Sequence, residues 1–342
     1  MVNIGFIGCG QMGRDHIDRI ANRMGNAHIV AIYDLNRAAA EKAVADFGLD
    51  AKICDSADEL IHAPEVDAVV MASRNDAHLE PLLACIEAGK PVFTEKPMTI
   101  DGADSWKVVE AEVKAGKKLV QVGFNRRYDT GYEQMKEIID SKQIGELLCG
   151  DCRHFNAQAA TSYYRTDNVV NDTLIHECDI LHYLFDDDYK AVEIKCARQN
   201  RLNPNGAENL REPQIAIIEF QHGAIVTVEA NVNCQYGYDI QCRLVGESGT
   251  VSLPDVATPE VRQAERIYHS ISSDWFARFL DAYDKEMRAF LNRVERGEEP
   301  SGQMATAWDG YVANVAADAM LESLHNGGRV EISLPERPAL YA

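Results

Sequence analysis

A glycine-rich segment close to the first residue has the spacing of a dinucleotide-binding turn. The pattern G-x-G-x-x-G occupies Gly8–Gly13, directly after the apolar run Ile4–Ile7 and at the start of the predicted helix Gln11–Arg23. In such a turn the first glycine allows the sharp bend, the second leaves room for a pyrophosphate, and the third lets helix and strand pack closely. The N–H groups of the first helical turn then bind the phosphates.

A carboxylate about 20 residues further along fits the ribose half of the same cofactor. Asp34 follows the second apolar run, Ile29–Tyr33. Its oxygens can accept hydrogen bonds from both ribose hydroxyls and would repel a 2′-phosphate, which favours NAD over NADP. Arg37 qualifies this preference, because a guanidinium so close could instead accept a 2′-phosphate.

A lysine at a strand end is a candidate for catalysis. Glu95-Lys96-Pro97 follows the predicted strand Val92–Thr94. Ligands of open α/β sheets bind beyond the carboxyl ends of the strands, and Pro97 biases Lys96 away from helical dihedral angles. Lys96 therefore lies either over the cofactor cleft or on the surface, and the local sequence favours neither.

Asp172 and His176 could form a proton-transfer pair. They are spaced i, i+4 on the predicted helix Asp172–Phe185, which puts a carboxylate beside an imidazole, and Asp179 continues the same face. A neighbouring acid fixes the tautomer of a histidine and suits a general base near neutral pH. A capping aspartate beside a structural histidine has the same spacing, so this alternative stays open.

Other motifs that could carry chemistry are weak. His176 lacks the second histidine of a zinc protease motif. Cys149-x-x-Cys152 is a lone pair with strand-like neighbours, which disfavours zinc. His16 and His28 are interpreted as surface or packing residues. We therefore predict no metal.

The first 124 residues alternate short apolar runs with helical stretches. Runs that are apolar throughout are typical of parallel strands covered on both faces, so the alternation predicts a doubly wound sheet. The predicted strands are Ile4–Ile7, Ile29–Tyr33, Ala68–Ala72, Val92–Thr94 and Leu119–Phe124, and the predicted helices are Gln11–Arg23, Arg37–Phe47, Ala77–Ala88 and Ala103–Ala115.

After Phe124 the pattern changes to that of an α+β domain. Apolar and polar residues alternate with period two around residues 225–230, which is typical of an antiparallel sheet. The predicted helices are Tyr132–Lys142, Asp172–Phe185, Trp275–Arg296 and Ala305–His325, and the predicted strands are Val192–Ala197, Gln214–Phe220, Ala224–Val232 and Ile240–Val245.

Composition narrows the class of protein. The 342 residues suit two domains, and 46% hydrophobic residues suffice for two cores. The formal net charge of −20 argues against a nucleic-acid or anionic-membrane partner. No secretion signal or run of ~18 apolar residues is found, so we expect a cytoplasmic protein. Nine cysteines in apolar stretches suit reduced core thiols.

Taken together, the motifs resemble those of the Gfo/Idh/MocA oxidoreductase family over nearly the whole chain. Within that family, three further stretches are most similar to the bacterial members that oxidise inositol, and two of them are more specific than the family-wide motifs. The segments that carry the resemblance are Gly8–Gly13, Asp34, Glu95-Lys96-Pro97, Asp172-x-x-x-His176, and residues 120–129, 232–242 and 306–311.

The resemblance implies NAD-dependent oxidation of a ring CH–OH of myo-inositol to the ketone 2-keto-myo-inositol, as a step of inositol catabolism. It puts Lys96, Asp172 and His176 at the reacting carbon, with His176 as general base. Contacts to substrate hydroxyls are implied for Arg127, His154, Asn156, Thr173, Asp179 and Tyr238. The expected cofactor contacts are Gly8, Gly10, Gln11, Met12, Gly13, Asp34, Arg37, Ser73, Asn75, His78, Glu95 and Lys96.

The implied fold is α/β, with an NAD-binding Rossmann domain over residues 1–124. A substrate-binding and oligomerisation α+β domain over residues 125–342 would contain an open, mainly antiparallel sheet that forms the interface of a homotetramer. Such a sheet should be apolar on both faces. We assign Ile215, Ile217, Val226 and Val228 to one face, and Ala216, Ile218 and Ile225 to the other.

Two departures from the pattern of the inositol-oxidising members leave the substrate open. Asn125 stands where those members often have methionine, and Phe155 where they often have arginine, both near the expected pocket. The alternatives are scyllo-inositol, D-chiro-inositol or a pyranose sugar. A non-catalytic sugar-sensing regulator is the alternative from another class, and the joint presence of Lys96, Asp172 and His176 disfavours it.

Overall fold

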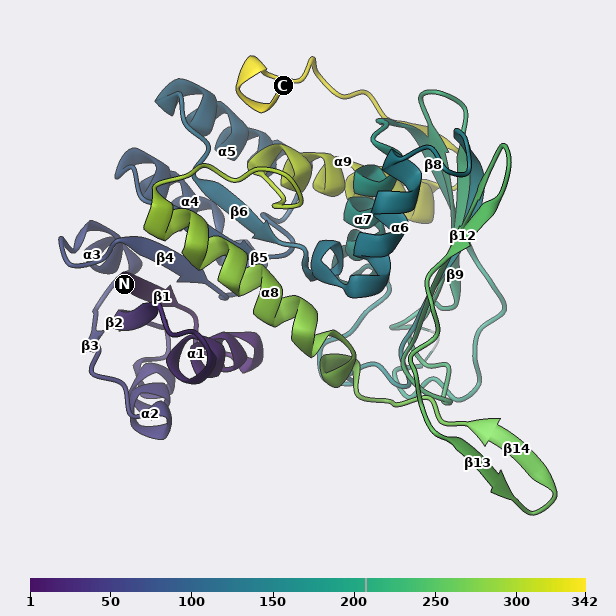
Figure 1. Cartoon of the computed structure of the whole chain (residues 1–342), viewed down its shortest axis with the longest axis horizontal. Coiled ribbons are helices and arrows are strands. Elements are labelled where there is room, and N and C mark those ends of the chain that lie inside the picture. The colour runs from purple at the N-terminus through teal and green to yellow at the C-terminus, as the bar shows by residue number, and fades with distance from the viewer. Residues whose placement is uncertain (207) are drawn as a thin grey trace. The chain divides into compact units, whose positions relative to one another are not determined.

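A computed structural model describes residues 1–206 and 208–342 (Figure 1). The chain divides into two compact units. The first comprises Met1–Tyr128, Asp281–Val315 and Pro335–Ala342, and the second comprises Asp129–Leu280 and Ala316–Leu334.

The first unit is built on a six-stranded, wholly parallel sheet in the order β3-β2-β1-β4-β5-β6. Every residue of β4, β5 and β6 is buried, because helices cover both faces of the sheet. This confirms the predicted Rossmann-type fold. The strands are β1 (Val2–Ile7), β2 (Ala27–Tyr33), β3 (Lys52–Ile53), β4 (Ala68–Met71), β5 (Val92–Glu95) and β6 (Val120–Gly123).

The helices of the first unit follow the predicted pattern, with one short helix added. Left-handed Gly48 and Gly116 end two of them, and the Asp101 side chain caps the start of another. The sequence analysis missed β3 and α3, which are short. The helices are α1 (Gln11–Arg23), α2 (Arg37–Phe47), α3 (Ala57–His62), α4 (Leu79–Glu87) and α5 (Gly102–Ala115), with 3₁₀ turns η1 (Asn75–Ala77), η2 (Asn125–Tyr128) and η4 (Ala339–Tyr341).

Part of a late helix belongs to the first unit. Helix α8 (Trp275–Arg296) contributes Met287, Phe290 and Leu291 to the same buried cluster as the residues of α1 and β1. The Arg293 guanidinium also donates to the carbonyl of Leu119, at 2.9 Å. Sequence continuity alone does not show that a distant amphipathic helix completes the first core.

The second unit contains a seven-stranded sheet in the order β12-β11-β7-β10-β9-β8-β15. All pairings are antiparallel except β7 with β10, so the sheet is mixed but mainly antiparallel, as predicted. The strands are β7 (Leu147–Phe155), β8 (Tyr189–Cys196), β9 (Gln214–Phe220), β10 (Ile225–Asn231), β11 (Asp239–Gly246), β12 (Thr250–Ser252) and β15 (Val330–Glu331).

One face of this sheet is covered, and the predicted assignment of residues to the two faces was wrong. In the register, Val226 lies opposite Ile218 and Val228 opposite Ala216, and all four are fully buried. Residues directly opposite each other share a face, so Ile215 and Ile217 belong instead with Ile225 on the open side. On this open side the three isoleucines lie opposite the polar residues Glu219, Thr227 and Glu229.

Helices α6 (Thr130–Asp140), α7 (Ile175–Phe185) and the later part of α9 (Ala307–Asn326) belong to the second unit. Figure 1 shows α6 and α7 beside the sheet. A π-helical segment, Val169–Leu174, precedes α7, so Asp172 does not start a regular α-helix as predicted. The five residues from Asp172 to His176 therefore cross from a π turn into an α turn.

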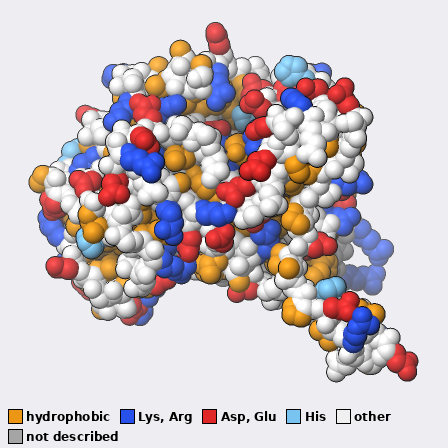
Figure 2. Space-filling model, in the orientation of Figure 1, with side chains coloured by type: hydrophobic (Ala, Val, Ile, Leu, Met, Phe, Trp, Pro, Cys, Tyr) orange, Lys and Arg blue, Asp and Glu red, His pale blue; other side chains and the backbone are white. Residues whose placement is uncertain are grey.

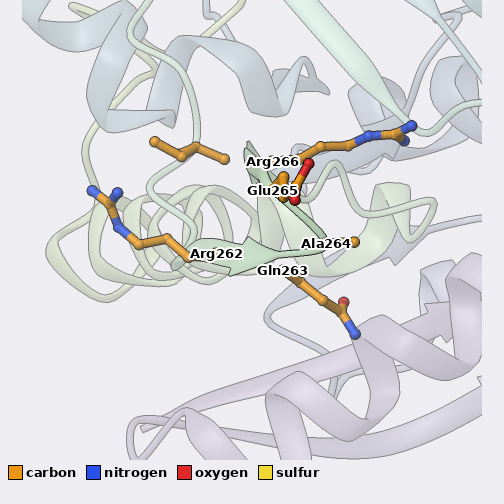
Figure 3. Close-up of a pocket in the computed structure, with 6 residues that line it drawn as sticks. Arg262, Gln263, Ala264, Glu265 and Arg266 are labelled. Carbon is orange, nitrogen blue, oxygen red and sulfur yellow. The ribbon is translucent and has the colours of Figure 1, made fainter.

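A two-stranded hairpin, β13 (Glu260–Gln263) and β14 (Arg266–His269), is exposed along almost its whole length. Its turn residues Ala264 and Glu265 have φ of 49° and 60°, a left-handed backbone that non-glycine residues rarely adopt. A shallow pocket is lined by the exposed residues 262–267, whose side chains point away from one another (Figure 3). No expected site residue lies there.

The surface carries charges of both signs (Figure 2), and the cysteines that the structure describes form no disulfide. Acidic and basic side chains are interspersed on the face seen in Figure 2. All nine cysteines are free, and six of them are buried. Within the described ranges, no helix is both long and apolar enough to cross a membrane.

Candidate functional site

The glycine turn of the first unit has the geometry that its sequence predicts. Gly8 has a left-handed φ of 97°, and a Cβ there would lie 2.5 Å from the Ser73 nitrogen. A Cβ on Gly13 would lie 2.0 Å from the Gly8 carbonyl oxygen. A Cβ on Gly10 would have no atom within 4 Å, so the space beside this exposed residue at the start of α1 is open.

Asp34 sits beside this turn. One carboxylate oxygen accepts from the Cys9 N–H at 2.6 Å, and the other accepts from the Asn36 N–H at 2.7 Å. Burial, with the Asp34 charge, raises the pKa of the Cys9 thiol to about 12, so Cys9 stays protonated and is no nucleophile. Arg37 pairs with Glu41 and Asp55 at 3.2 and 2.6 Å, which engages its guanidinium.

The loops that follow β4 and β5 are tied together by His78. Its imidazole is 1% exposed, with Nε2 3.1 Å from the Ser73 carbonyl and Nδ1 3.2 Å from the Pro97 carbonyl. Burial lowers the pKa of His78, so it is neutral at neutral pH. In the structure, His78 contacts the loops that carry Ser73 and Lys96. Its contact with the cofactor stays a prediction.

The residues at this edge of the sheet fit NAD. The open space at Gly10 suits a pyrophosphate, and the α1 N-terminus carries no acidic residue in its first turn to oppose it. The buried Ser73 hydroxyl oxygen has no hydrogen-bond partner among the described residues, as expected of a group that awaits a ligand. Asn75 and Met12 are partly exposed and Gln11 fully so, all near the same edge.

Glu95 and Lys96 end β5 at the same edge. Glu95 is buried, and its carboxylate lies 2.6 Å from His16 Nε2 and accepts from the Lys96 N–H at 3.2 Å. Burial alone would raise the pKa of Glu95, but the hydrogen bond from His16 and the charge of Lys96 hold this pKa below its usual range. Glu95 is therefore an ionised carboxylate inside the protein.

The second unit contains two histidines whose rings lie close together. His154, on β7, is 3% exposed, and its Nδ1 lies 3.1 Å from a carboxylate oxygen of Glu177 on α7. The His154 ring is 6.0 Å from that of His176 and 5.9 Å from that of Tyr238, measured between centroids. The structure thus brings together two of the predicted substrate contacts and the predicted base.

The π segment adds two more of the predicted residues to this unit. Thr173 is buried and its hydroxyl makes a short contact with the Tyr164 hydroxyl. Burial raises the pKa of Tyr164 well above its usual value, so Tyr164 stays neutral and can donate. Asp179 is 2% exposed on α7, while Asp172 is partly exposed on the π segment.

Two further predicted substrate contacts are Arg127 and Asn156. Arg127 is in the first unit, 2% exposed, and donates to Asp309 at 3.0 Å. Asn156 directly follows β7 and pairs through its backbone with Asn231.

The two departures from the resemblance have different surroundings. Asn125 is buried, and its side-chain oxygen has no partner among the described residues. Phe155 follows His154 on β7 and so faces the opposite side, where it packs against Tyr236 at 6.3 Å. The Phe155 ring therefore lies on the other side of β7 from His154.

The sequence analysis missed three residues of these sites: His16, Glu177 and Tyr164. His16, interpreted as a surface or packing residue, is fully buried. For His16, the only available signal was its spacing of three residues from both Gly13 and Arg19. For Glu177, it was the position next to His176. Tyr164 lies in a loop and carried no signal.

The parallel sheet, the glycine turn and the carboxylate after β2 define an oxidoreductase of the NAD-binding Rossmann class. Family models agree: residues 2–124 match the NAD-binding Rossmann fold of the Gfo/Idh/MocA oxidoreductases, and residues 136–332 match their C-terminal alpha/beta domain. The chain belongs to the Gfo/Idh/MocA oxidoreductase family, as the motifs predicted.

Individual relatives match over their full lengths. Inositol 2-dehydrogenase of Serratia proteamaculans is 44% identical over 99% of both chains. Inositol 2-dehydrogenase/D-chiro-inositol 3-dehydrogenase of Halalkalibacterium halodurans is 42% identical over 100% of this chain and 96% of its own. The crystal structure of myo-inositol dehydrogenase from Lactobacillus casei with NAD(H) and myo-inositol has a TM-score of 0.97 at 36% identity over all of both chains.

The glycine geometry generates a paired prediction. Gly10→Ala should keep the fold, because its Cβ meets open space, yet weaken NAD binding roughly 10- to 100-fold by crowding the pyrophosphate. Gly13→Ala should instead destabilise the protein by at least roughly 1–3 kcal/mol, because its Cβ overlaps a backbone oxygen. Thermal unfolding and fluorescence titration with NADH measure the two effects. Equal loss of stability in both variants would contradict the assignment.

Proposed function

We propose that the protein is an NAD-dependent dehydrogenase that oxidises a ring secondary alcohol of myo-inositol to 2-keto-myo-inositol. The observation that carries the proposal is the full-length likeness to relatives named inositol 2-dehydrogenase. The open space at Gly10 for a pyrophosphate and the polar cluster around His154 support it, because the reaction needs a dinucleotide and a polyol.

The chemistry divides between cofactor and protein. NAD, when bound, supplies the hydride acceptor. In this proposal His176 removes the proton of the reacting hydroxyl, Asp172 orients the imidazole, and the Lys96 ammonium donates to the same oxygen. A neutral imidazole as base and an ammonium as donor together stabilise the alkoxide that develops as the C–H bond breaks.

Recognition of a polyol requires many fixed donors and acceptors, because ring epimers differ only in the direction of their hydroxyls. We propose that the substrate hydroxyls are held by Arg127, His154, Asn156, Thr173, Asp179 and Tyr238. Burial of His154, Thr173 and Asp179 supports this role, since a misplaced hydroxyl would leave such groups unpaired at a cost of several kcal/mol in order of magnitude.

D-chiro-inositol is the second candidate substrate, favoured by the dual name of the Halalkalibacterium relative. Scyllo-inositol and pyranose sugars stay as alternatives within the same class. A sugar-sensing regulator would need neither the Asp172–His176 pair nor Lys96.

We further propose a cytoplasmic homotetramer that acts in inositol catabolism. The open face of the second sheet supports the assembly: Ile215, Ile217 and Ile225 lie there, and Ile225 is 46% exposed. Exposed apolar side chains on a sheet face are typical of an interaction surface. Glu229 and Thr227, between them, provide polar contacts.

The proposed reaction predicts growth of reduced-nicotinamide absorbance when the protein is mixed with NAD and myo-inositol. A scan of inositol stereoisomers and sugars, each with NAD and with NADP, ranks the substrates. Because the Asp34 carboxylate would repel a 2′-phosphate, we expect much faster turnover with NAD than with NADP. Turnover of a pyranose but of no inositol would contradict the proposed substrate, and equal use of NADP would contradict the role of Asp34.

The proposed base predicts a defined loss. His176→Ala should lower kcat by roughly 10²- to 10⁴-fold, the usual contribution of a general base, while NADH binding persists. Steady-state kinetics and NADH titration separate the two. Near-normal kcat in this variant would transfer the role of base to another group, with Lys96 the next candidate.

The proposed assembly predicts opposite behaviour at two sheet residues. Ile217→Lys, on the open face, should give a smaller particle that stays folded. Val228→Lys, on the covered face, should lower the midpoint of thermal unfolding by more than about 10 °C, because a charge would be buried in the core. Light scattering and thermal unfolding measure both. A wild-type monomer at micromolar concentration would refute the tetramer.

A further inference from the structure

A chain of buried polar contacts runs from the middle of α1 to the end of β5. His16 Nε2 lies 2.6 Å from Glu95, and His16 Nδ1 lies 2.9 Å from an Arg19 guanidinium nitrogen. Arg19 donates onward to Asp284 of α8 at 2.6 Å. His16 and Arg19 are both 0% exposed. These residues lie behind Lys96, away from any direct part in the chemistry assigned so far.

The partners of His16 assign its protonation state. A guanidinium has five N–H donors and no acceptor, so Arg19 must donate to Nδ1. Nδ1 therefore carries no proton, and the imidazole is the neutral tautomer with its proton on Nε2. That proton is donated to Glu95. A doubly protonated His16 would lose the bond from Arg19 and place two cations in contact.

The carboxylate of Glu95 is thereby held at both oxygens. One accepts from His16 Nε2–H and the other from the backbone N–H of Lys96. The imidazole is itself fixed by edge contacts with Phe93 at 5.6 Å and Tyr283 at 6.0 Å. A carboxylate with both oxygens engaged cannot turn, so the peptide that bears the Lys96 side chain is fixed with it.

We propose that Glu95, held by His16 and Arg19, is a positioning residue for Lys96 that fixes its backbone. This inference rests on the proposed role of Lys96 as a donor to the reacting oxygen. The charged or titratable groups that face the pair are Asp15, Arg19, His78, Lys96, Tyr283 and Asp284.

The test uses Glu95→Gln, which removes the charge but keeps the size, with Glu112→Gln as the matched control. Glu112 is another fully buried carboxylate of the first unit, which accepts from the Val120 N–H and the Tyr341 hydroxyl. Glu95→Gln should lower kcat by on the order of 10²-fold, as misplaced catalytic groups do, with a change of less than about 3-fold in KM for NAD. Loss of kcat with an unchanged KM for NAD is the result expected when the lysine is misplaced but the cofactor still binds.

His16 variants probe the same contact from the other side. His16→Ala leaves Glu95 without its buried donor and should reproduce the loss of kcat. His16→Gln keeps an N–H donor of similar reach and should recover most of that loss. Equal losses of kcat and of thermal stability in Glu95→Gln and Glu112→Gln would overturn the proposal. A raised KM for NAD at normal kcat would overturn it too, since Glu95 would then be a cofactor contact.

A second measurement does not depend on turnover. Lys96 is partly exposed, so its acylation by a small amine reagent can be followed by peptide mass spectrometry. At pH 8, Glu95→Gln and His16→Ala should each raise the acylation rate of Lys96 several-fold, and Glu112→Gln should leave it unchanged. Unchanged rates in all variants would refute the proposal even if the wild-type protein oxidised no inositol. Absence of inositol oxidation with raised rates would refute the proposed function alone.

Discussion

Among the glycines of the first unit, Gly13 has the least room for a side chain, because a Cβ would lie 2.0 Å from the Gly8 carbonyl oxygen, and the cofactor edge depends on this close packing. Any side chain at Gly13 would overlap that oxygen, so α1 can rest directly on the turn after β1. The buried face of α1 continues from Gly13 to His16 about one turn later, and to Arg19 about one turn after that. A methyl group at Gly13 would push α1 outward. His16 would then move away from Glu95, and the α1 N-terminus that is expected to bind the phosphates would shift.

Both units use the same device to hold a polar side chain still. In the first, a buried carboxylate meets a buried imidazole at Glu95 and His16, and in the second at Glu177 and His154. Burial of a carboxylate is costly unless hydrogen bonds replace those of water, and once they do, the geometry has little freedom. The two pairs differ in direction. In the first the acid faces the predicted catalytic lysine, and in the second the histidine lies beside the predicted base.

The sequence predicted those elements whose patterns are local. The parallel strands of the first unit are compact, mostly apolar runs, and β4 is apolar throughout. Strand β7 was not assigned, because its polar residues Asp151, Arg153 and His154 conceal the alternation in a strand with one open face. The faces of β9 and β10 were mismatched because alternation within each strand does not give the register between them. His16 was left as a surface or packing residue because its partner Glu95 is 79 residues away.

The spacing of the predicted catalytic pair was interpreted with α-helical geometry, but Asp172 lies in a π segment before α7. A π turn takes in more residues than an α turn, so the i, i+4 rule of an α-helix does not describe it directly. Thr173, fixed by its contact with Tyr164, anchors this wider turn from inside the unit. Asp172 is partly exposed while its neighbour Thr173 is buried. π turns of this kind occur frequently at functional sites, and here the irregular backbone itself determines where the carboxylate can meet an imidazole.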